Sequence, residues 1–240
     1  MKRLTTVGDP EVVARRAATD IARHLTRARE QRAPVHLALS GGTTPGRSYE
    51  LLATEMADWD GIEIWFVDER CVEPEDERSN YRLAAETLLA PAGIPATRVH
   101  RMLGEMGPDV GADLYALELT ARVAPDEHGV PVLDLCVLGV GPDGHVASLF
   151  PDSPTLRAGD RAVCLGVEDS PKPPPERITL SLAMLRAARR CLLIATGAEK
   201  AGAISTMLGE PSEHVPASLL RRERLSVIVD DAASPAPRGP

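Results

Sequence analysis

The chain has 240 residues, of which 43% are hydrophobic and 26% charged, and its formal net charge is −8. This length suits one α/β domain with a substantial hydrophobic core, and the composition argues against wholesale disorder. The acidic balance argues against nucleic-acid binding, although a local cluster of arginines and backbone N–H groups could still bind a small anion.

We see no secretory signal, no membrane-spanning run and no cysteine motif in the sequence. The two basic residues near the N-terminus have no apolar segment behind them, and the longest apolar runs are strand-length, well short of a membrane span. We therefore expect a cytoplasmic protein with no membrane partner. The cysteines lie far apart and without CxxC spacing, so we expect neither a zinc site nor a disulfide framework. They are Cys71, Cys136, Cys164 and Cys191.

Helical and strand-like segments alternate along the chain. Apolar residues at helical spacing predict helices, whereas short apolar runs predict buried strands. The predicted helices lie at 11–29, 49–56, 79–90, 110–121, 182–189 and 199–208. The predicted strands are VHLALS (35–40), IEIWFV (62–67), RVHRM (98–102), LDLCVLGV (133–140), RAVCLGV (161–167), RITLS (177–181), CLLIATG (191–197) and LSVIVD (225–230).

Apolar strands separated by helices are typical of a largely parallel sheet that is covered by helices on both faces. We expect one doubly wound α/β domain over residues 1–230, followed by a flexible tail at 231–240 that is rich in proline, alanine and glycine. In such sheets ligands bind at the carboxyl ends of the strands, so the polar residues that follow each strand are the candidates for a site.

A glycine-containing loop, SGGTTPG (40–46), connects the first predicted strand to a helix. Two adjacent glycines let the backbone approach a ligand closely, and the N–H groups of the first helical turn point outward unpaired, which suits a phosphate. The lysine of a Walker loop is missing, which disfavours nucleoside triphosphate chemistry. A sharp turn before a capped helix would give the same pattern. The candidate phosphate ligands are Ser40, Gly41, Gly42, Thr43 and Thr44.

The triplet DER follows the second predicted strand, so Asp68 and Arg70 lie at the same rim. The acidic residues could hydrogen-bond sugar hydroxyls, while Arg70 could present its guanidinium to a carbonyl or a phosphate. A solvated loop is the commoner explanation, and a second DER at 76–78 shows how easily the triplet arises. Ser79 and Asn80 are binding candidates that could also simply cap the next helix.

The segment GVGPDGHVASLFP (139–151) ends the most strand-like run of the chain. Gly141 and Gly144 free the backbone for an unusual turn, and His145 can take and return a proton near neutral pH. Asp143 could orient the imidazole, or could instead brace the loop through backbone N–H groups.

Two basic residues later in the chain could complete a site. Arg177 begins the strand RITLS after the proline-rich segment SPKPPPER (170–177), which is either a plain connector or a rigid arm that presents this arginine. Lys200 lies just beyond a strand end and near the start of a helix, where it could reach an anion. Each could equally be a solvated surface charge.

In this order, SGGTTP, DER, SNY, GVGPDGHVASLFP, RIT and GAEK resemble the 6-phosphogluconolactonase family, over about residues 10–230. The resemblance implies the Rossmann-like fold that this family shares with glucosamine-6-phosphate deaminases and ribose-5-phosphate isomerases. The deaminases share the DGH core but typically continue with a phenylalanine and Asn-Glu-Pro. Here ASLFP follows, which is the lactonase ending.

The resemblance implies hydrolysis of 6-phospho-D-glucono-1,5-lactone to 6-phospho-D-gluconate, a step of the oxidative pentose phosphate pathway. His145 would be the general base that activates water, a role typically worth about 10²–10⁴ in rate. Arg70, or else the backbone N–H groups of a glycine turn, would stabilise the charge that develops on the carbonyl oxygen. No metal or other cofactor is implied.

The same resemblance distributes the binding roles. The SGGTT loop, Lys200 and Arg177 would bind the phosphate, and Asp68 and Asn80 would meet sugar hydroxyls. We expect a small-molecule substrate as the partner, with the protein a monomer or a homodimer. Two alternatives stay open: an amino-sugar-phosphate deaminase or isomerase in which Asp68 moves a proton on carbon, and a sugar-phosphate-binding module without catalysis.

Overall fold

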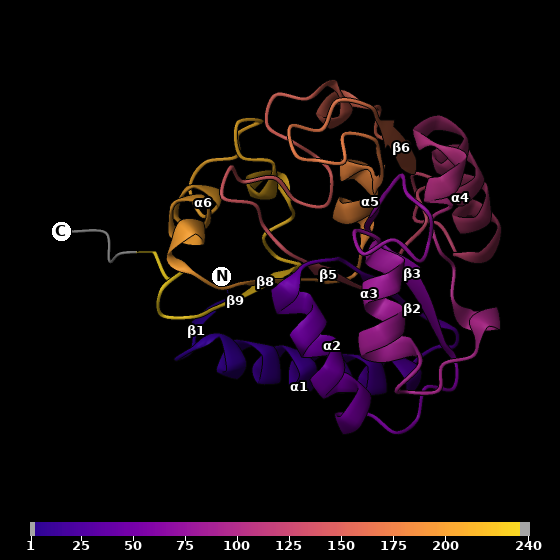
Figure 1. The fold of residues 1–240 in the computed structure, drawn as a ribbon, viewed down its shortest axis with the longest axis horizontal. Coiled ribbons are helices and arrows are strands. Elements are labelled where there is room, and N and C mark those ends of the chain that lie inside the picture. Colours follow the sequence, from indigo (N-terminus) through magenta and orange to yellow (C-terminus); the bar gives the residue numbers. More distant parts are fainter. Residues whose placement is uncertain (1–2, 236–240) are drawn as a thin grey trace.

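The computed structural model describes residues 3–235 and is organised around a six-stranded parallel sheet with the strand order β1-β9-β8-β5-β2-β3 (Figure 1). Every neighbouring pair in this sheet is parallel, which confirms the predicted doubly wound α/β fold. Its strands are β1 (Arg3–Thr6), β2 (Val35–Leu39), β3 (Ile62–Phe66), β5 (Leu135–Leu138), β8 (Cys191–Ala195) and β9 (Leu225–Val229).

Helices cover both faces of this sheet, with α1 and α2 on one side and α5 and α6 on the other (Figure 1). The helices are α1 (Pro10–Arg29), α2 (Thr43–Glu55), α3 (Asn80–Ala84), α4 (Pro108–Arg122), α5 (Leu182–Ala187) and α6 (Ala201–Met207). A π-helical turn, Ala85–Leu89, continues α3. Short 3₁₀ segments lie at Ala96–Arg98, Gly104–Met106, Pro154–Arg157, Ala198–Lys200 and Pro216–Leu219.

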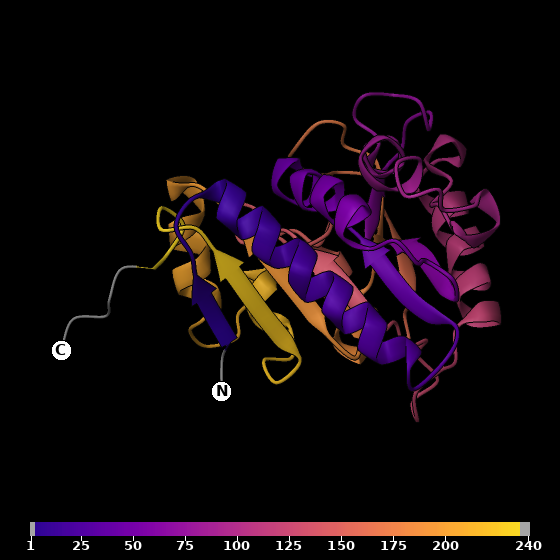
Figure 2. The ribbon, with the colours of Figure 1, turned by 90° about the horizontal axis from the view of Figure 1, so that it is seen from below.

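The apolar pattern accounts for the packing of the first helix. Asp9 caps α1 by accepting a hydrogen bond from the Val12 N–H at 3.0 Å, and Pro10 fits the first helical position. Ile21 and Leu25, one helical turn apart, are fully buried. Figure 2 shows α1 lying over the sheet and roughly along its strands, so this apolar face covers one side of the parallel sheet.

A second, three-stranded antiparallel sheet has the order β4-β7-β6, from β4 (Asp68–Arg70), β7 (Arg177–Leu180) and β6 (Cys164–Val167). The sequence predicts β6 and β7 as strands but does not separate them from the parallel sheet. Leu180 N donates to Val67 O at 2.8 Å, so the small sheet branches from the main one directly after β3. Its register sets Asp68 opposite Thr179 and Arg70 opposite Arg177, which unites two of the predicted motifs.

Two segments differ from the sequence-based expectation or refine it. RVHRM (98–102) is not a strand, because Val99 makes a single bridge to Ile64 and the ladder goes no further. The helix expected at 110–121 is present as α4, but its apolar stripe faces solvent, with Leu117 68% exposed. No helix in the described part of the chain is long and apolar enough to cross a membrane.

The predicted flexible tail at 231–240 is described only in part, since 236–240 lie outside the described residues. Residues 231–235 are anchored to the fold: Asp231 N donates to Gly8 O at 3.0 Å, and the hydroxyl of Ser234 lies 3.1 Å from that of Thr6. Ala233 is fully buried, and its N–H donates to Asp230 Oδ1 at 2.8 Å.

Candidate active site

A cavity of about 340 Å³ lies at the carboxyl ends of β2, β5 and β8, next to the antiparallel sheet. Loops that follow parallel strands converge at this edge, where ligands of such folds normally bind. The cavity brings together most of the residues expected to form a site. Those that line it are Ser40, Gly41, Gly42, Thr43, Thr44, Asp68, Arg70, Asn80, Gly141, His145, Arg177 and Lys200.

The glycine loop supplies one wall of the cavity. Gly42, at φ +107°, is the N-cap residue of α2 and provides no side-chain cap, so the first N–H groups of this helix are free to meet an anion. At Gly41 an added Cβ would lie 1.8 Å from Asn80 Oδ1, so only glycine fits there. The Ser40 hydroxyl is buried without a hydrogen-bond partner among the described residues, and it lines the cavity as an available donor.

Tyr49 fixes the backbone of this loop. Its hydroxyl accepts from Ser40 N and donates to Ser40 O, each at 3.0 Å, and burial raises the pKa of the phenol, so it stays protonated. At the other end of the loop, the hydroxyl of Thr44 lies 2.8 Å from that of Thr196, which follows β8. The loop is therefore tied to the helix behind it and to a neighbouring strand.

Asp68 lies at the start of β4, only 6% exposed, with both carboxylate oxygens engaged. Oδ2 accepts from the Ser148 hydroxyl at 2.7 Å, and Oδ1 accepts from Asn80 Nδ2 at 3.1 Å. Asn80 Nδ2 also donates to Asp68 O at 2.9 Å. The pair is held firmly at the cavity wall, and its remaining lone pairs are available to hydroxyl groups of a ligand.

Ser79 does not line the cavity. Its hydroxyl accepts from Arg82 N at 3.1 Å, as the N-cap of α3, and donates to Glu69 Oε2 at 3.0 Å. Glu69 also accepts from three backbone N–H groups, those of Arg70, Asn80 and Tyr81, each at 2.7 Å. Burial raises the pKa of Glu69, and these hydrogen bonds oppose the shift. Glu69 thus holds the loop between β4 and α3 in place.

Arg70 and Arg177 are neighbours across the β4–β7 ladder. Arg70 donates from Nη1 to Arg78 O, while its Nε is buried without a partner in the part of the chain that the structure describes. Arg177, 5% exposed, donates to Pro174 O at 3.2 Å and to Lys172 O at 3.1 Å. Arg177 therefore lines the cavity and also holds the proline-rich segment against it.

The loop after β5 positions the histidine. Gly141 N donates to His145 O and Gly144 N donates to Gly141 O, each at 3.0 Å, with Gly144 at φ +84°. A Cβ at Gly141 would lie 2.0 Å from His145 Nδ1, so the imidazole packs directly over this glycine. Neither Gly144 nor Asp143 lines the cavity; both lie behind the residues that do.

Asp143 contacts both the ring and the loop. Its Oδ1 lies 2.6 Å from His145 Nδ1 and 3.4 Å from His145 N, so it orients the imidazole and braces the turn together. Burial opposes ionisation, but the hydrogen bond from His145 and the charge of Lys172 outweigh it and lower the pKa of Asp143. A carboxylate can only accept, so we assign the proton to Nδ1, which leaves Nε2 as the basic nitrogen.

Lys172 is a charged cavity residue that the sequence does not single out. Its Nζ lies 3.3 Å from His145 Nδ1 and 3.5 Å from Asp143 Oδ1. The lysine in SPKPPPER was the available signal, but composition does not show which way such a segment folds. Lys200 also lines the cavity, and burial and then the charge of Lys172 lower its pKa. No cluster of His, Cys, Asp and Glu within residues 3–235 could hold a metal ion.

Comparison with known proteins identifies the family. Residues 8–229 match the model of the family described as glucosamine-6-phosphate isomerases/6-phosphogluconolactonase. The chain belongs to this family. It is 38% identical to the 6-phosphogluconolactonase of Streptomyces coelicolor, with 94% of this chain and 91% of the relative covered. It is 37% identical to the human 6-phosphogluconolactonase, with 93% and 86% covered.

Solved structures place the fold within the same family. The 6-phosphogluconolactonase of Trypanosoma brucei superposes with a TM-score of 0.86 at 26% identity, over 97% of each chain. A monomeric glucosamine-6-phosphate deaminase of the NagB superfamily superposes with a TM-score of 0.79 at 20% identity, over 96% of this chain and 98% of its own. The second likeness is one of fold alone, and it agrees with the predicted Rossmann-like fold.

Proposed function

We propose that this protein hydrolyses 6-phospho-D-glucono-1,5-lactone to 6-phospho-D-gluconate, with His145 as the general base. The observation that carries the proposal is the Asp143–His145 pair, joined at 2.6 Å, whose imidazole lines a cavity that also holds a phosphate-type loop. The family membership and the relatives named 6-phosphogluconolactonase support the same activity.

The chemistry follows from the tautomer of His145. Nε2 takes a proton from water as the water oxygen attacks the lactone carbonyl carbon, and the carbonyl electrons move onto oxygen. The imidazolium that forms is stabilised by the Asp143 carboxylate, which stays ionised because its pKa is lowered. When the tetrahedral intermediate collapses, the C–O bond to the ring oxygen breaks and Nε2 returns the proton to that oxygen.

Two cationic groups flank the reacting centre in this proposal. The Nε of Arg70, which has no partner among residues 3–235, is the donor for the developing oxyanion. The N–H groups of Gly141 and Gly144, the alternative donors, already pair with His145 O and Gly141 O. The second cationic group is the ammonium of Lys172, which lies 3.3 Å from His145 Nδ1 and 3.5 Å from Asp143 Oδ1.

The phosphate would bind at the other end of the cavity. The uncapped start of α2, the free hydroxyl of Ser40 and the ammonium of Lys200 supply hydrogen-bond donors and positive charge. Asp68 and Asn80, between the two ends, would meet sugar hydroxyls. Anchoring the phosphate fixes the lactone against His145, which reduces the entropy cost of reaching the transition state.

The hydrogen bonds of Asp68 argue against the alternative of a deaminase or isomerase in which this residue moves a proton on carbon. A base that moves a proton on carbon must reach that carbon, whereas the hydrogen bonds from the Ser148 hydroxyl and the Asn80 amide hold both oxygens of Asp68 at the cavity wall. Release of ammonia from glucosamine 6-phosphate would revive that alternative. The predicted cytoplasmic location and the monomeric or homodimeric state stay predictions.

The test is hydrolysis of freshly generated lactone by the wild type and by His145→Ala, with the spontaneous rate of opening subtracted. We expect the wild type to accelerate opening and the variant to lose about 10²–10⁴ of that acceleration. His214→Ala is the matched control, because His214 also pairs with an aspartate, Asp152, but is exposed and does not line the cavity. A folded His145→Ala that keeps its rate would refute the assignment of the base.

A further inference from the structure

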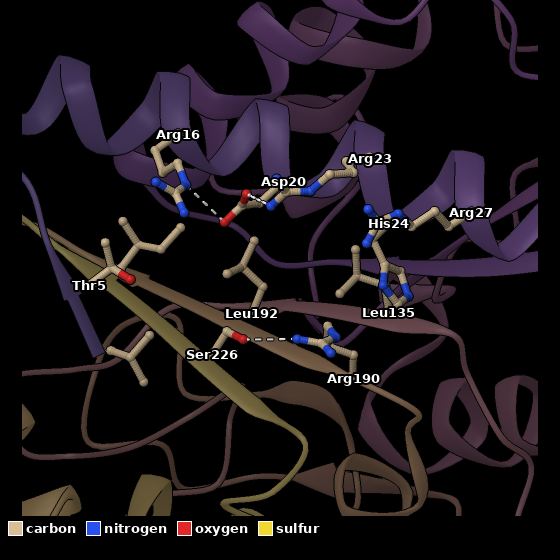
Figure 3. Close-up of a pocket in the computed structure, with 12 residues that line it drawn as sticks. Thr5, Arg16, Asp20, Arg23, His24, Arg27, Leu135, Arg190, Leu192 and Ser226 are labelled. Atoms are coloured by element: carbon tan, nitrogen blue, oxygen red, sulfur yellow. Dashed lines mark hydrogen bonds and ion pairs between the residues drawn. The ribbon is translucent and has the colours of Figure 1, made fainter. Parts of the chain in front are cut away.

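A second cavity, of about 190 Å³, lies between α1 and the parallel sheet, near the amino ends of β5 and β8 (Figure 3). It shares no lining residue with the candidate active site, which lies at the carboxyl ends of the strands. Leu135 and Leu192 contribute an apolar floor from the strands. We call this space the α1–sheet cavity.

One stripe of α1 lines the α1–sheet cavity with mostly basic side chains. The stripe recurs at three- and four-residue intervals, so its members share one side of the helix, next to the buried apolar stripe. Its members are Arg16, Asp20, Arg23, His24 and Arg27. Asp20 pairs with Arg16 at 3.1 Å and with Arg23 on its other oxygen, so a single carboxylate serves two guanidinium groups.

The remaining two arginines of the cavity have no carboxylate partner. Arg27 on the helix and Arg190 just before β8 make no ion pair with any described residue; Arg190 donates only to the Ser226 hydroxyl, at 3.1 Å. Figure 3 shows them on opposite walls, one from the helix and one from the sheet. Four arginines against one carboxylate leave a surplus of three positive charges, in a chain whose net charge is −8.

We propose that the α1–sheet cavity binds a small anion of the phosphate class, either inorganic phosphate or a phosphate ester with a small organic group. Guanidinium groups match phosphate oxygens in paired hydrogen bonds, and the two arginines without a carboxylate partner lack a counter-charge. The volume, about 190 Å³, is below the roughly 300–1,000 Å³ of sites for drug-sized ligands. It therefore suits a compact anion rather than a whole nucleotide.

His24 provides a reporter inside this cavity. Its Nε2 lies 3.2 Å from Asp134 O, to which it donates. Burial lowers the pKa of His24, and the charges of Arg190 and Arg32 lower it further, against the hydrogen bond to Asp134. An anion among the arginines would oppose these charges and raise the pKa of His24. Binding should thus appear in the ring proton resonances of this residue.

The experiment titrates inorganic phosphate, and in a second arm methyl phosphate, into the full chain at low ionic strength, with calorimetry and the His24 ring resonances as readouts. We expect saturable binding that shifts His24 in the wild type, and at least tenfold weaker binding at this site in Arg27→Gln/Arg190→Gln. The matched control is Arg15→Gln/Arg161→Gln, which removes the same charge from exposed positions outside the cavity. It should bind within about twofold of the wild type.

Lys200→Ala separates this cavity from the phosphate loop of the candidate active site, because it should leave the His24 shift intact. Lactone hydrolysis should be unchanged in Arg27→Gln/Arg190→Gln. Should the change at half-buried Arg190 disturb folding, Arg27→Glu alone, at an exposed position, must still weaken binding. No His24 shift in the wild type, an equal shift in the Arg27 and Arg190 variant, or its loss in Lys200→Ala would overturn the proposal.

Discussion

Replacement of Asp143 by asparagine tests the proposed mechanism most directly. The carboxylate accepts from His145 Nδ1 at 2.6 Å, so the change removes the charge that stabilises the imidazolium. The new amide can also donate to Nδ1, which forces the proton onto Nε2 and removes the basic nitrogen from the cavity. In the serine-protease triad the same exchange costs about 10⁴ in kcat, and we expect a loss of about 10²–10⁴ here, or about 2.7–5.4 kcal/mol of barrier.

The assay is initial-rate hydrolysis of freshly generated lactone, with kcat and KM separated. The loss should fall on kcat, because the phosphate contacts are untouched. Asp152→Asn is the matched control, since Asp152 forms an exposed pair with His214 at 2.9 Å, away from the cavity. A kcat within about fivefold of the wild type, or a change in KM alone, would refute the orienting role of Asp143.

The same variant should also change how the stability of the fold depends on pH. The pKa of Asp143 is lower in the folded chain than in the unfolded one, so its ionised form stabilises the fold above the unfolded value, near 3.9. This contribution is lost as the pH falls through the folded pKa. Unfolding monitored from pH 6 to pH 2 should show wild-type stability falling toward that of Asp143→Asn in acid. A stability difference that stays constant across this range would contradict the linkage.

Three further changes test the binding site and the packing. Lys200→Ala should raise KM about tenfold or more and change kcat much less; an equal loss of kcat at unchanged KM would contradict a phosphate-binding role. Gly41→Ala sets a Cβ 1.8 Å from a cavity side chain, so it should lower the free energy of unfolding by about 1–3 kcal/mol and remove most of the activity. Gly159→Ala, with open space around it, should leave the free energy of unfolding in denaturant nearly unchanged. Leu119→Ala, at a fully buried position of α4, should lower the free energy of unfolding by about 2–5 kcal/mol. Leu117→Ala, at a position that is 68% exposed, should change it by no more than about 0.5 kcal/mol.

The sequence predicts the parallel sheet well because each of its buried strands is an apolar run that can be recognised locally. All of β2 is buried, so its unbroken apolar run directly reflects a strand covered on both faces. The rule that ligands bind at strand carboxyl ends then correctly anticipates that Ser40, Arg70 and His145 line one cavity. These predictions depend on local pattern, which a single sequence contains.

Other features depend on partners distant in the chain, which local pattern does not reveal. The run RITLS indicates a strand but not that β7 pairs antiparallel with β4, more than a hundred residues earlier. Ser79 shows the same ambiguity, because one hydroxyl suits either a ligand or a helix cap, and here it caps α3. The position of Lys172 beside His145 and that of Arg190 beneath α1 likewise follow from the assembled fold.

The hydrogen bond from Ser148 to Asp68 bears on how activities diverge within this family. Ser148 belongs to the ASLFP segment that distinguishes the lactonase ending, yet it does not line the cavity; it occupies Asp68 Oδ2 from behind, at 2.7 Å. A relative that used Asp68 to transfer a proton on carbon would first have to release this hydrogen bond, so that the carboxylate could move. The substitution that releases Asp68 would therefore be at Ser148, outside the cavity lining. Protein engineering that varied only the cavity-lining residues would leave the Ser148–Asp68 hydrogen bond in place.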